Sequence, residues 1–153
     1  MKIYIASDHG GFDLKRAILH NEDFKKMDIE FEDLGPAELK DDDDYTDYAF
    51  TLVEEIKKHP SNLGILICRS GIGMSIAANK AKGIYAALCF TPKHAIMAKE
   101  HNNANVLCLD SDYEDKEIHY KIIENFVKTE FAGFESRHGR RVKEIMKYEE
   151  SVH

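Results

Sequence analysis

The sequence lacks the paired cysteines of a disulfide framework or a zinc site. Its three cysteines, Cys68, Cys89 and Cys108, are far apart and odd in number, and no CxxC motif is present. The HExxH and HxxxH spacings of metal-binding histidines are absent as well. We therefore expect neither structural disulfides nor a metal site.

Long apolar stretches and an excess of basic residues are also missing. No run approaches the roughly 20 residues of a membrane-spanning helix. The N-terminal MKIYIASDHGG is too short for a signal peptide, whose apolar run has about 7–15 residues. We expect a cytoplasmic protein without a membrane partner. The net charge of -7, from 21 basic and 28 acidic residues, disfavours a nucleic-acid partner because phosphate backbones select basic surfaces.

Short β-rich runs alternate with helical patterns along the whole chain of 153 residues, a length that suits one domain (1–153). The run LGILIC is continuously apolar, as is typical of a buried parallel strand. The alternation predicts an α/β fold, a parallel sheet with helices on both faces. The expected strands cover 2–7, 29–34, 63–68, 84–89 and 105–110, and the expected helices cover 13–27, 48–58, 71–81, 92–101, 114–130 and 137–150.

Such folds bind ligands beyond the carboxyl ends of their strands. The segment SDHGG (7–11) follows the first strand, Cys68–Gly71 ends the third, and Thr91 and Pro92 follow the fourth. His101–Asn103 comes just before the fifth. We therefore expect most of the reactive side chains to converge on one edge of the sheet.

The stretch LGILICRSGIGMSIAANK (63–80) puts Cys68 and a glycine-rich turn, Ser70–Ser75, where a strand gives way to a helix. A thiol beside a helix N-terminus favours the thiolate, which can accept a proton or attack an electrophile. Glycines allow close approach of the backbone, and free N–H groups attract a phosphate or a charge that develops during a reaction. Ile76 stands where GxGxxG needs its third glycine, and no GK[ST] follows, so no nucleotide cofactor is indicated. A structural cysteine beside a ligand-free turn is the alternative.

Acid, base and anion-binding candidates lie elsewhere in the chain. Asp8 could orient His9 for proton transfer near neutral pH. Arg137 and Arg141, four residues apart, share a helix face and suit a phosphate or carboxylate, unless they only form surface salt bridges. We expect the acidic run 41–44 to be a solvated loop rather than a metal site. Together these features fit proton abstraction next to a carbonyl of a small anionic substrate, through an enediolate.

The segments SDHGGFDLK, DYTDYA, GILICRSGIGMSIAANK, HNNANVL and RHGRRV resemble, in order and spacing, those of type B ribose-5-phosphate isomerases. That family includes galactose-6-phosphate isomerase subunits and allose-6-phosphate isomerases, and the resemblance extends over residues 2–146. It implies a Rossmann-like three-layer α/β/α fold with a five-stranded parallel sheet. It also implies aldose–ketose isomerisation of ribose 5-phosphate or a related sugar phosphate through a cis-enediolate, without metal or organic cofactor.

The resemblance further implies a homodimer with active sites at the subunit interface, the C-terminal helix (about 136–150) packing on the partner; whether dimers pair into tetramers stays open. By position, Cys68 matches the base that moves the proton between C1 and C2. The resemblance assigns ring opening of the sugar to Ser70 and His101, with Asp8 in support. It places Gly71, Gly73, Ser75 and Asn102 around the enediolate. It places His9, Arg137 and Arg141 at the phosphate, and Tyr45 and His138 in the lining of the site.

Four positions depart from the family pattern. Arg69 replaces a common glycine, Ser70 a threonine and Thr46 a proline. Asp110–Asp112 (DSD) replaces a Gly-Ser-Arg whose arginine contributes to phosphate binding, and a carboxylate there would repel a phosphate. Our hypothesis is that Arg69 supplies the missing positive charge. The alternatives are an isomerase of a six-carbon sugar phosphate, a non-catalytic sugar-phosphate-binding protein, and a thiol redox protein that uses Cys68.

Overall fold

The computed structural model describes residues 1–112 and 115–153. It contains a five-stranded sheet in the order β2-β1-β3-β5-β4, with every neighbouring pair parallel. The strands are β1 (Lys2–Ser7), β2 (Glu30–Asp33), β3 (Leu63–Cys68), β4 (Ala86–Leu88) and β5 (Val106–Asp110). The described helices are α1 (Phe12–Leu19), α2 (Glu22–Lys26), α3 (Tyr45–Lys58), α4 (Ile72–Ala78), α5 (Pro92–Asn102), α6 (Lys116–Lys128) and α7 (Arg137–Val152). The predicted parallel α/β fold is confirmed.

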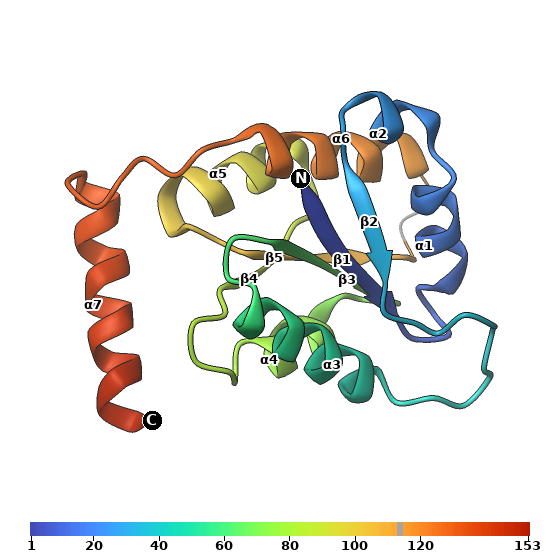
Figure 1. Cartoon of the computed structure of the whole chain (residues 1–153), viewed down its shortest axis with the longest axis horizontal. Coiled ribbons are helices and arrows are strands. Elements are labelled where there is room, and N and C mark those ends of the chain that lie inside the picture. Colours follow the sequence, from blue (N-terminus) through green and yellow to red (C-terminus); the bar gives the residue numbers. More distant parts are fainter. Residues whose placement is uncertain (113–114) are drawn as a thin grey trace.

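Alternating side chains of the strands build two cores, one on each face of the sheet. In β3, Ile65 and Ile67 face the core formed with α1, α2, α5 and α6. Leu66 and Cys68 point the other way, into the core formed with α3 and α4. Figure 1 shows α2, α5 and α6 above the sheet and α3 and α4 below it, so the molecule has the three layers expected of this fold.

The predicted helix 13–27 is two helices in the structure. The chain leaves α1 at His20, and the side chain of Asn21 then accepts hydrogen bonds from the N–H groups of Asp23 and Phe24, at 2.8 and 3.4 Å. Asn21 is thus an N-cap that restarts the chain as α2, a function for which asparagine is well suited. The helical spacing of apolar residues continues across this break, so the sequence pattern did not predict it. The helix predicted over 114–130 begins at Lys116, and Glu114 lies outside the described residues.

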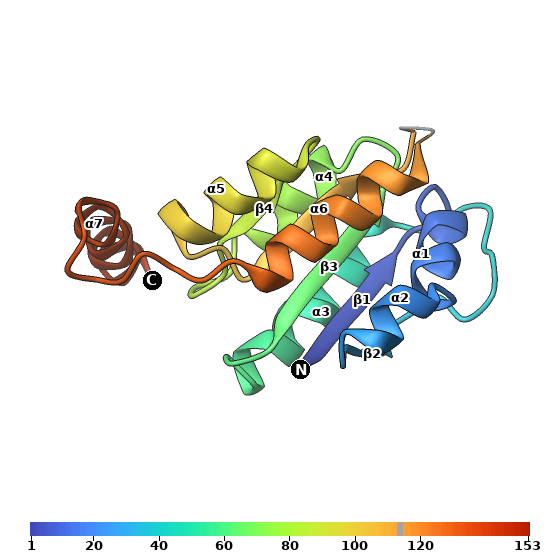
Figure 2. The ribbon, with the colours of Figure 1, turned by 90° about the horizontal axis from the view of Figure 1, so that it is seen from above.

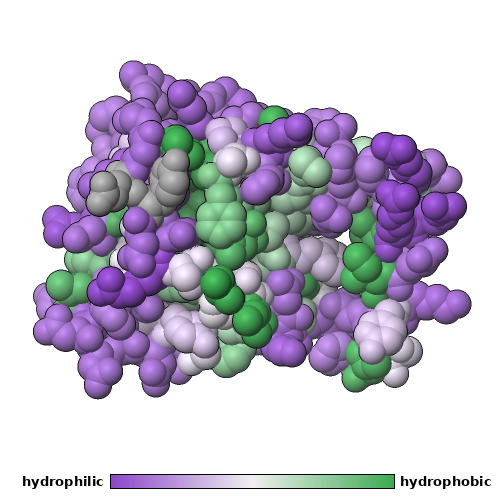
Figure 3. Space-filling model, turned by 180° about the vertical axis from the view of Figure 1, so that it is seen from behind, coloured by the Kyte–Doolittle hydropathy of each residue, from purple (hydrophilic) through white to green (hydrophobic). Residues whose placement is uncertain are grey.

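Helix α7 is set apart from the sheet, as Figures 1 and 2 show. Only Gly139 and Val142 of this helix are buried, and its neighbour is α5. Several of its apolar side chains are exposed, namely Ile145, Met146, Tyr148 and Val152. Figure 3 shows apolar side chains across the middle of the face opposite that of Figure 1 and again on the separate α7. None of the described helices combines the length and apolar character needed to cross a membrane.

Candidate active site

The loops after β1, β3 and β5 are tied together at the carboxyl edge of the sheet. The Ser111 hydroxyl donates to the Gly10 carbonyl at 2.8 Å, and the backbone N–H of Ser111 donates to the Cys68 carbonyl at 3.0 Å. Gly11 allows the loop after β1 to lie against the end of β3, because a Cβ there would lie 2.4 Å from the carbonyl oxygen of Ile67. The edge that the sequence predicted as a ligand site is therefore closely packed and fixed in shape.

Cys68 ends β3 and is 5% exposed, with its sulfur at the start of α4. The N–H of Gly71 donates to Sγ at 3.1 Å, an arrangement that can stabilise negative charge on the sulfur. Gly71 adopts φ +72°, in the left-handed region that glycine tolerates best, and this turns the backbone N–H toward the thiol. The predicted strand end, glycine turn and helix start occur in this order in the structure.

The other residues of the turn make mainly local contacts. The Ser70 hydroxyl oxygen accepts from the N–H of Ile72 at 3.3 Å, and Ser70 is exposed. The Ser75 hydroxyl donates to the Ile72 carbonyl at 2.9 Å, back into its own helix. Gly73 lies against the ring of Tyr45, since a Cβ there would be 2.6 Å from that ring. Tyr45, at the start of α3, thus covers the first turn of α4.

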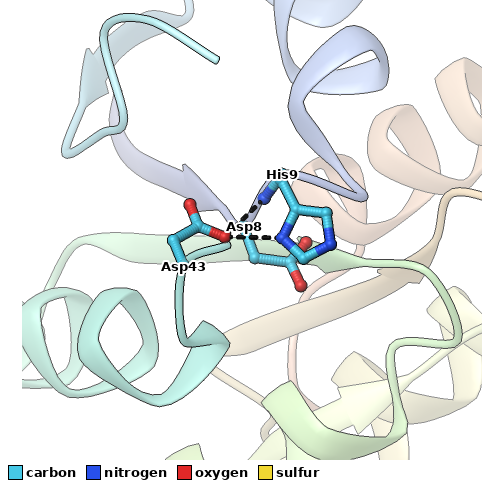
Figure 4. Close-up of side chains that lie close together, drawn as sticks. All are labelled: Asp8, His9 and Asp43. Carbon is cyan, nitrogen blue, oxygen red and sulfur yellow. Dashed lines mark hydrogen bonds and ion pairs between the residues drawn. The ribbon is translucent and has the colours of Figure 1, made fainter. Parts of the chain in front are cut away.

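Asp8, His9 and Asp43 form a cluster beside this turn, shown in Figure 4. Asp8 is 7% exposed and accepts the N–H of Gly11 at 3.1 Å. Oδ1 of Asp43 accepts both the backbone N–H and the ring Nδ1 of His9, at 2.9 and 2.7 Å. One ligand atom from each of the three residues lies within 4.8 Å of the others, close enough for a cation. The short Nδ1–Oδ1 hydrogen bond already occupies the ring nitrogen, so we interpret the cluster as hydrogen-bonded.

Asp43 is a residue that the sequence did not single out. The acidic run 41–44 was expected to be a solvated loop, and residues 41, 42 and 44 are indeed exposed. The Asp43 side chain is only 8% exposed. Its burial favours the neutral acid, but the hydrogen bonds from His9 and from Tyr48 outweigh that effect and lower the pKa of Asp43. Nothing in four successive aspartates tells which one turns inward, because the path of the loop decides it.

The prediction that His101 and Asn102 converge with the residues at the strand ends on one edge of the sheet is wrong within the chain. The helix α5 returns the chain to the opposite edge before β5 begins, where the N–H of Gly64 in β3 donates to the Asn105 carbonyl at 2.9 Å. A helix that joins two parallel strands must carry the chain back to the edge where the next strand begins. The residues thus separated from Cys68 lie at the end of α5 and the start of α7; they are His101, Asn102, Arg137, His138 and Arg141.

This second group is a compact cluster with positive charges. The rings of His101 and His138 stack with centroids 3.9 Å apart and an angle of 5° between their planes. Desolvation, followed by the proximity of His101, Arg137 and Arg141, lowers the pKa of His138. Arg137 and Arg141 are exposed, and so free to meet an anion. The chain therefore has two groups of candidate residues, which we call the cysteine edge (Asp8, His9, Tyr45, Cys68–Ser75) and the histidine edge (His101, Asn102, Arg137, His138, Arg141).

Arg69 and Asp112, two departures from the family pattern, face each other at the cysteine edge. Nη1 of Arg69 lies 3.7 Å from Oδ1 of Asp112, with the side chains 68% and 62% exposed. The Arg69 side chain passes over Gly10, where a Cβ would lie 2.5 Å from its Cγ. Exposed pairs of this kind contribute only about 0–1 kcal/mol, so the guanidinium can leave Asp112 for another anion.

The remaining cysteines differ from Cys68 in their surroundings. Burial raises the pKa of Cys89 to about 12 and raises that of Cys108 further, with added effects of the neighbouring thiols on Cys108. Both are therefore neutral thiols near neutral pH. Both are buried in the cores and pack as small apolar side chains.

Comparison with known proteins agrees with this architecture. A family model described as Ribose/Galactose Isomerase matches residues 3–145. The chain is 47% identical over 147 residues to a probable ribose-5-phosphate isomerase B of Mycoplasma pneumoniae, covering 96% of this chain and 94% of that protein.

Solved structures resemble the chain over nearly all its length. A ribose-5-phosphate isomerase B of Mycoplasma genitalium, determined with bound ribulose-5-phosphate, superposes with a TM-score of 0.90 at 44% identity, covering 97% of this chain and 96% of that one. A ribose-5-phosphate isomerase B of Clostridium thermocellum gives a TM-score of 0.91 at 39% identity, with 100% of both chains covered.

Proposed function

The chain belongs to the Ribose/Galactose Isomerase family, and we propose that it interconverts ribose 5-phosphate and ribulose 5-phosphate. The observation that carries this proposal is the similarity, at 44% identity and a TM-score of 0.90, to a structure with bound ribulose-5-phosphate. The grouping of a thiol, a glycine turn and a carboxylate–imidazole pair at the cysteine edge supports the same chemistry. An isomerase needs a base and a group that stabilises an enediolate, and this edge offers candidates for each.

Cys68 is the base in this proposal. Its thiolate takes the proton from C2 of the open-chain aldose and returns it to C1, while a proton passes from O2 to O1, so that the ketose has the same composition. Between the two steps the substrate is a cis-enediolate. The Gly71–Ser75 turn and Asn102 are the groups assigned to its negative charge, and Ser70 and His101, supported by Asp8, are assigned to ring opening.

The two edges of one chain do not meet, so the proposal includes a homodimer in which the histidine edge of one protomer completes the cysteine edge of its partner. His9 and the arginines Arg137 and Arg141 would then hold the phosphate from two sides. The exposed apolar residues of α7, a helix that stands off the sheet, support its packing on a second copy.

Arg69 is the further phosphate ligand of the proposal. It lies close enough to His9 to influence its titration, and its pair with Asp112 is exposed and therefore weak. In the resting protein Asp112 is paired with this arginine, so its carboxylate is partly neutralised where phosphate would approach.

The experiment is a coupled isomerase assay on ribose 5-phosphate, with a chelator present and with Cys68→Ala as the control. We expect turnover that the chelator leaves unchanged and that the variant loses while keeping its fold and its binding of sugar phosphate. Allose 6-phosphate and galactose 6-phosphate are assayed in parallel, and preference for either would assign a six-carbon substrate. Binding without turnover on all three sugars would mean a receptor, and near-normal turnover by Cys68→Ala would mean another base.

A further inference from the structure

The contact between Asp43 and His9 joins the loop before α3 to the end of β1. Two hydrogen bonds converge on one carboxylate oxygen, from the His9 backbone N–H at 2.9 Å and from its ring Nδ1 at 2.7 Å. The residues are 34 apart in sequence. Figure 4 shows the carboxylate facing the imidazole ring edge-on, with both contacts to the same oxygen. The main chain and the ring of His9 are thus held together.

The bond also determines which ring nitrogen faces outward. An ionised carboxylate only accepts hydrogen bonds, so Nδ1 must carry the proton in this contact. Nε2 is then the nitrogen left for a ligand, and the His9 side chain is 32% exposed, enough to be reached. The neighbouring charges are Asp8 on its own strand end, Asp43 on the loop and Arg69 from β3, while Tyr48 from α3 contacts Asp43.

The charge of His9 follows from the same surroundings. The hydrogen bond to Asp43 raises the pKa of His9, with smaller raising effects of the Asp8 and Asp43 charges and opposing effects of desolvation and Arg69. His9 therefore stays protonated to a higher pH than an ordinary histidine. A protonated imidazole donates from Nε2 to a phosphate oxygen and carries the complementary charge.

We propose that Asp43 is a positioning residue that fixes His9 through Nδ1, so that a charged Nε2–H is presented to the phosphate of the substrate. This inference rests on the proposed function for the identity of the ligand, whereas the contact between the two side chains does not depend on it. The role belongs to Asp43 alone in the acidic run, because the other three carboxylates are exposed.

The first test needs no substrate. The histidine titrations of the wild type, Asp43→Asn and Asp42→Asn are followed by NMR, with the His9 signal assigned through His9→Gln. Both aspartate variants remove one negative charge from the same loop, but only the first removes the partner of His9. We expect the pKa of His9 to fall in Asp43→Asn and to change little in Asp42→Asn. Equal values in all three proteins would overturn the proposal.

A wild-type measurement covers the case in which Asp43→Asn fails to fold. The ring ¹⁵N chemical shifts of wild-type His9, recorded above the pH at which the ring loses its charge, show which nitrogen keeps the proton. We expect the proton on Nδ1, the nitrogen that faces Asp43, and a neutral ring protonated on Nε2 would contradict the proposed pairing.

The second test measures KM and kcat for ribose 5-phosphate against pH. We expect Asp43→Asn to raise KM about three- to tenfold near neutral pH with kcat little changed, since it weakens one charge-assisted contact. The rise of KM with pH should begin at a lower pH in this variant than in the wild type or Asp42→Asn. The titration of the substrate phosphate is common to all three proteins and drops out of the comparison.

A variant that is less stable but has an unshifted KM profile would assign Asp43 a structural role only. Absence of ribose 5-phosphate turnover by the wild type would refute the proposed function. The NMR titration of His9 would then decide by itself whether Asp43 pairs with His9.

Discussion

At the scale of single residues, the surroundings of a side chain distinguish candidate site residues from residues of the same type that only pack in the core or lie in solvent. Cys68, Cys89 and Cys108 are all buried, but among the contacts of the described residues only Cys68 receives a backbone N–H from a glycine turn, and it lies at the end of its strand. Asp43 likewise differs from its three exposed neighbours in the loop by turning toward His9. Arg69 pairs with Asp112, so the question at this residue is whether its guanidinium can also bind the substrate phosphate.

The prediction for Arg69 concerns substrate affinity. Arg69→Ala should raise KM for ribose 5-phosphate about tenfold, the cost of one charge-assisted contact with phosphate, and leave kcat nearly unchanged. Steady-state kinetics measures both. Asp112→Asn is the matched variant, because it frees Arg69 and should leave KM equal or lower. An Arg69→Ala enzyme with the wild-type KM would remove this residue from the phosphate site.

At the scale of elements, the junction of β3 and α4 depends on the backbone of Gly71. Its φ of +72° aims the N–H at Cys68, and a Cβ there would lie 2.4 Å from Leu88 and 3.0 Å from the Leu109 carbonyl oxygen. Any side chain would thus meet both an unfavourable backbone conformation and a packed neighbouring strand. Gly83 has a similar φ of +78° but open space around its Cβ position.

The two glycines form a controlled pair for measuring this junction. Gly83→Ala should lower the free energy of unfolding by about 1 kcal/mol, the cost of the left-handed backbone alone. Gly71→Ala should lower it by about 2–4 kcal/mol, because crowding against β4 and β5 adds to that cost. Urea unfolding at one fixed protein concentration gives both values. Equal losses would mean that the packing around Gly71 adapts without cost.

At the scale of the whole molecule, the candidate site is divided between opposite edges of one sheet. The cysteine edge lies where the strands end, and the histidine edge lies where α5 ends and α7 begins. The length of the strands separates the two edges within one chain. A second copy can supply the missing edge, and a closed two-fold dimer would create two equal sites.

Mixing two impaired variants, assayed at a substrate concentration well below KM so that a lost phosphate contact lowers the rate, tests this division. Cys68→Ala and Arg141→Ala carry changes on opposite edges, so their mixed dimer contains one site built entirely from wild-type edges. After dissociation and reassembly of an equal mixture, activity should recover to about a quarter of the wild-type value, since half the dimers are mixed and each has one intact site. Cys68→Ala mixed with His9→Ala is the control, because both changes lie on the cysteine edge and every site keeps a defect. Equal behaviour of the two mixtures would place the complete site within one protomer.

The sequence by itself determined the sheet, because an apolar run such as LGILIC and the alternation of strands with helices leave few other ways to bury these side chains. It also located the Cys68 turn and the arginine helix, whose glycines and four-residue spacing are local signals. Only the tertiary structure decided the partners: that Asp43 turns toward His9, that Arg69 meets Asp112, and that His101 stacks on His138 away from Cys68. Local patterns report the conformation of a segment, whereas these contacts depend on where the loops and the return of α5 carry residues that are distant in sequence.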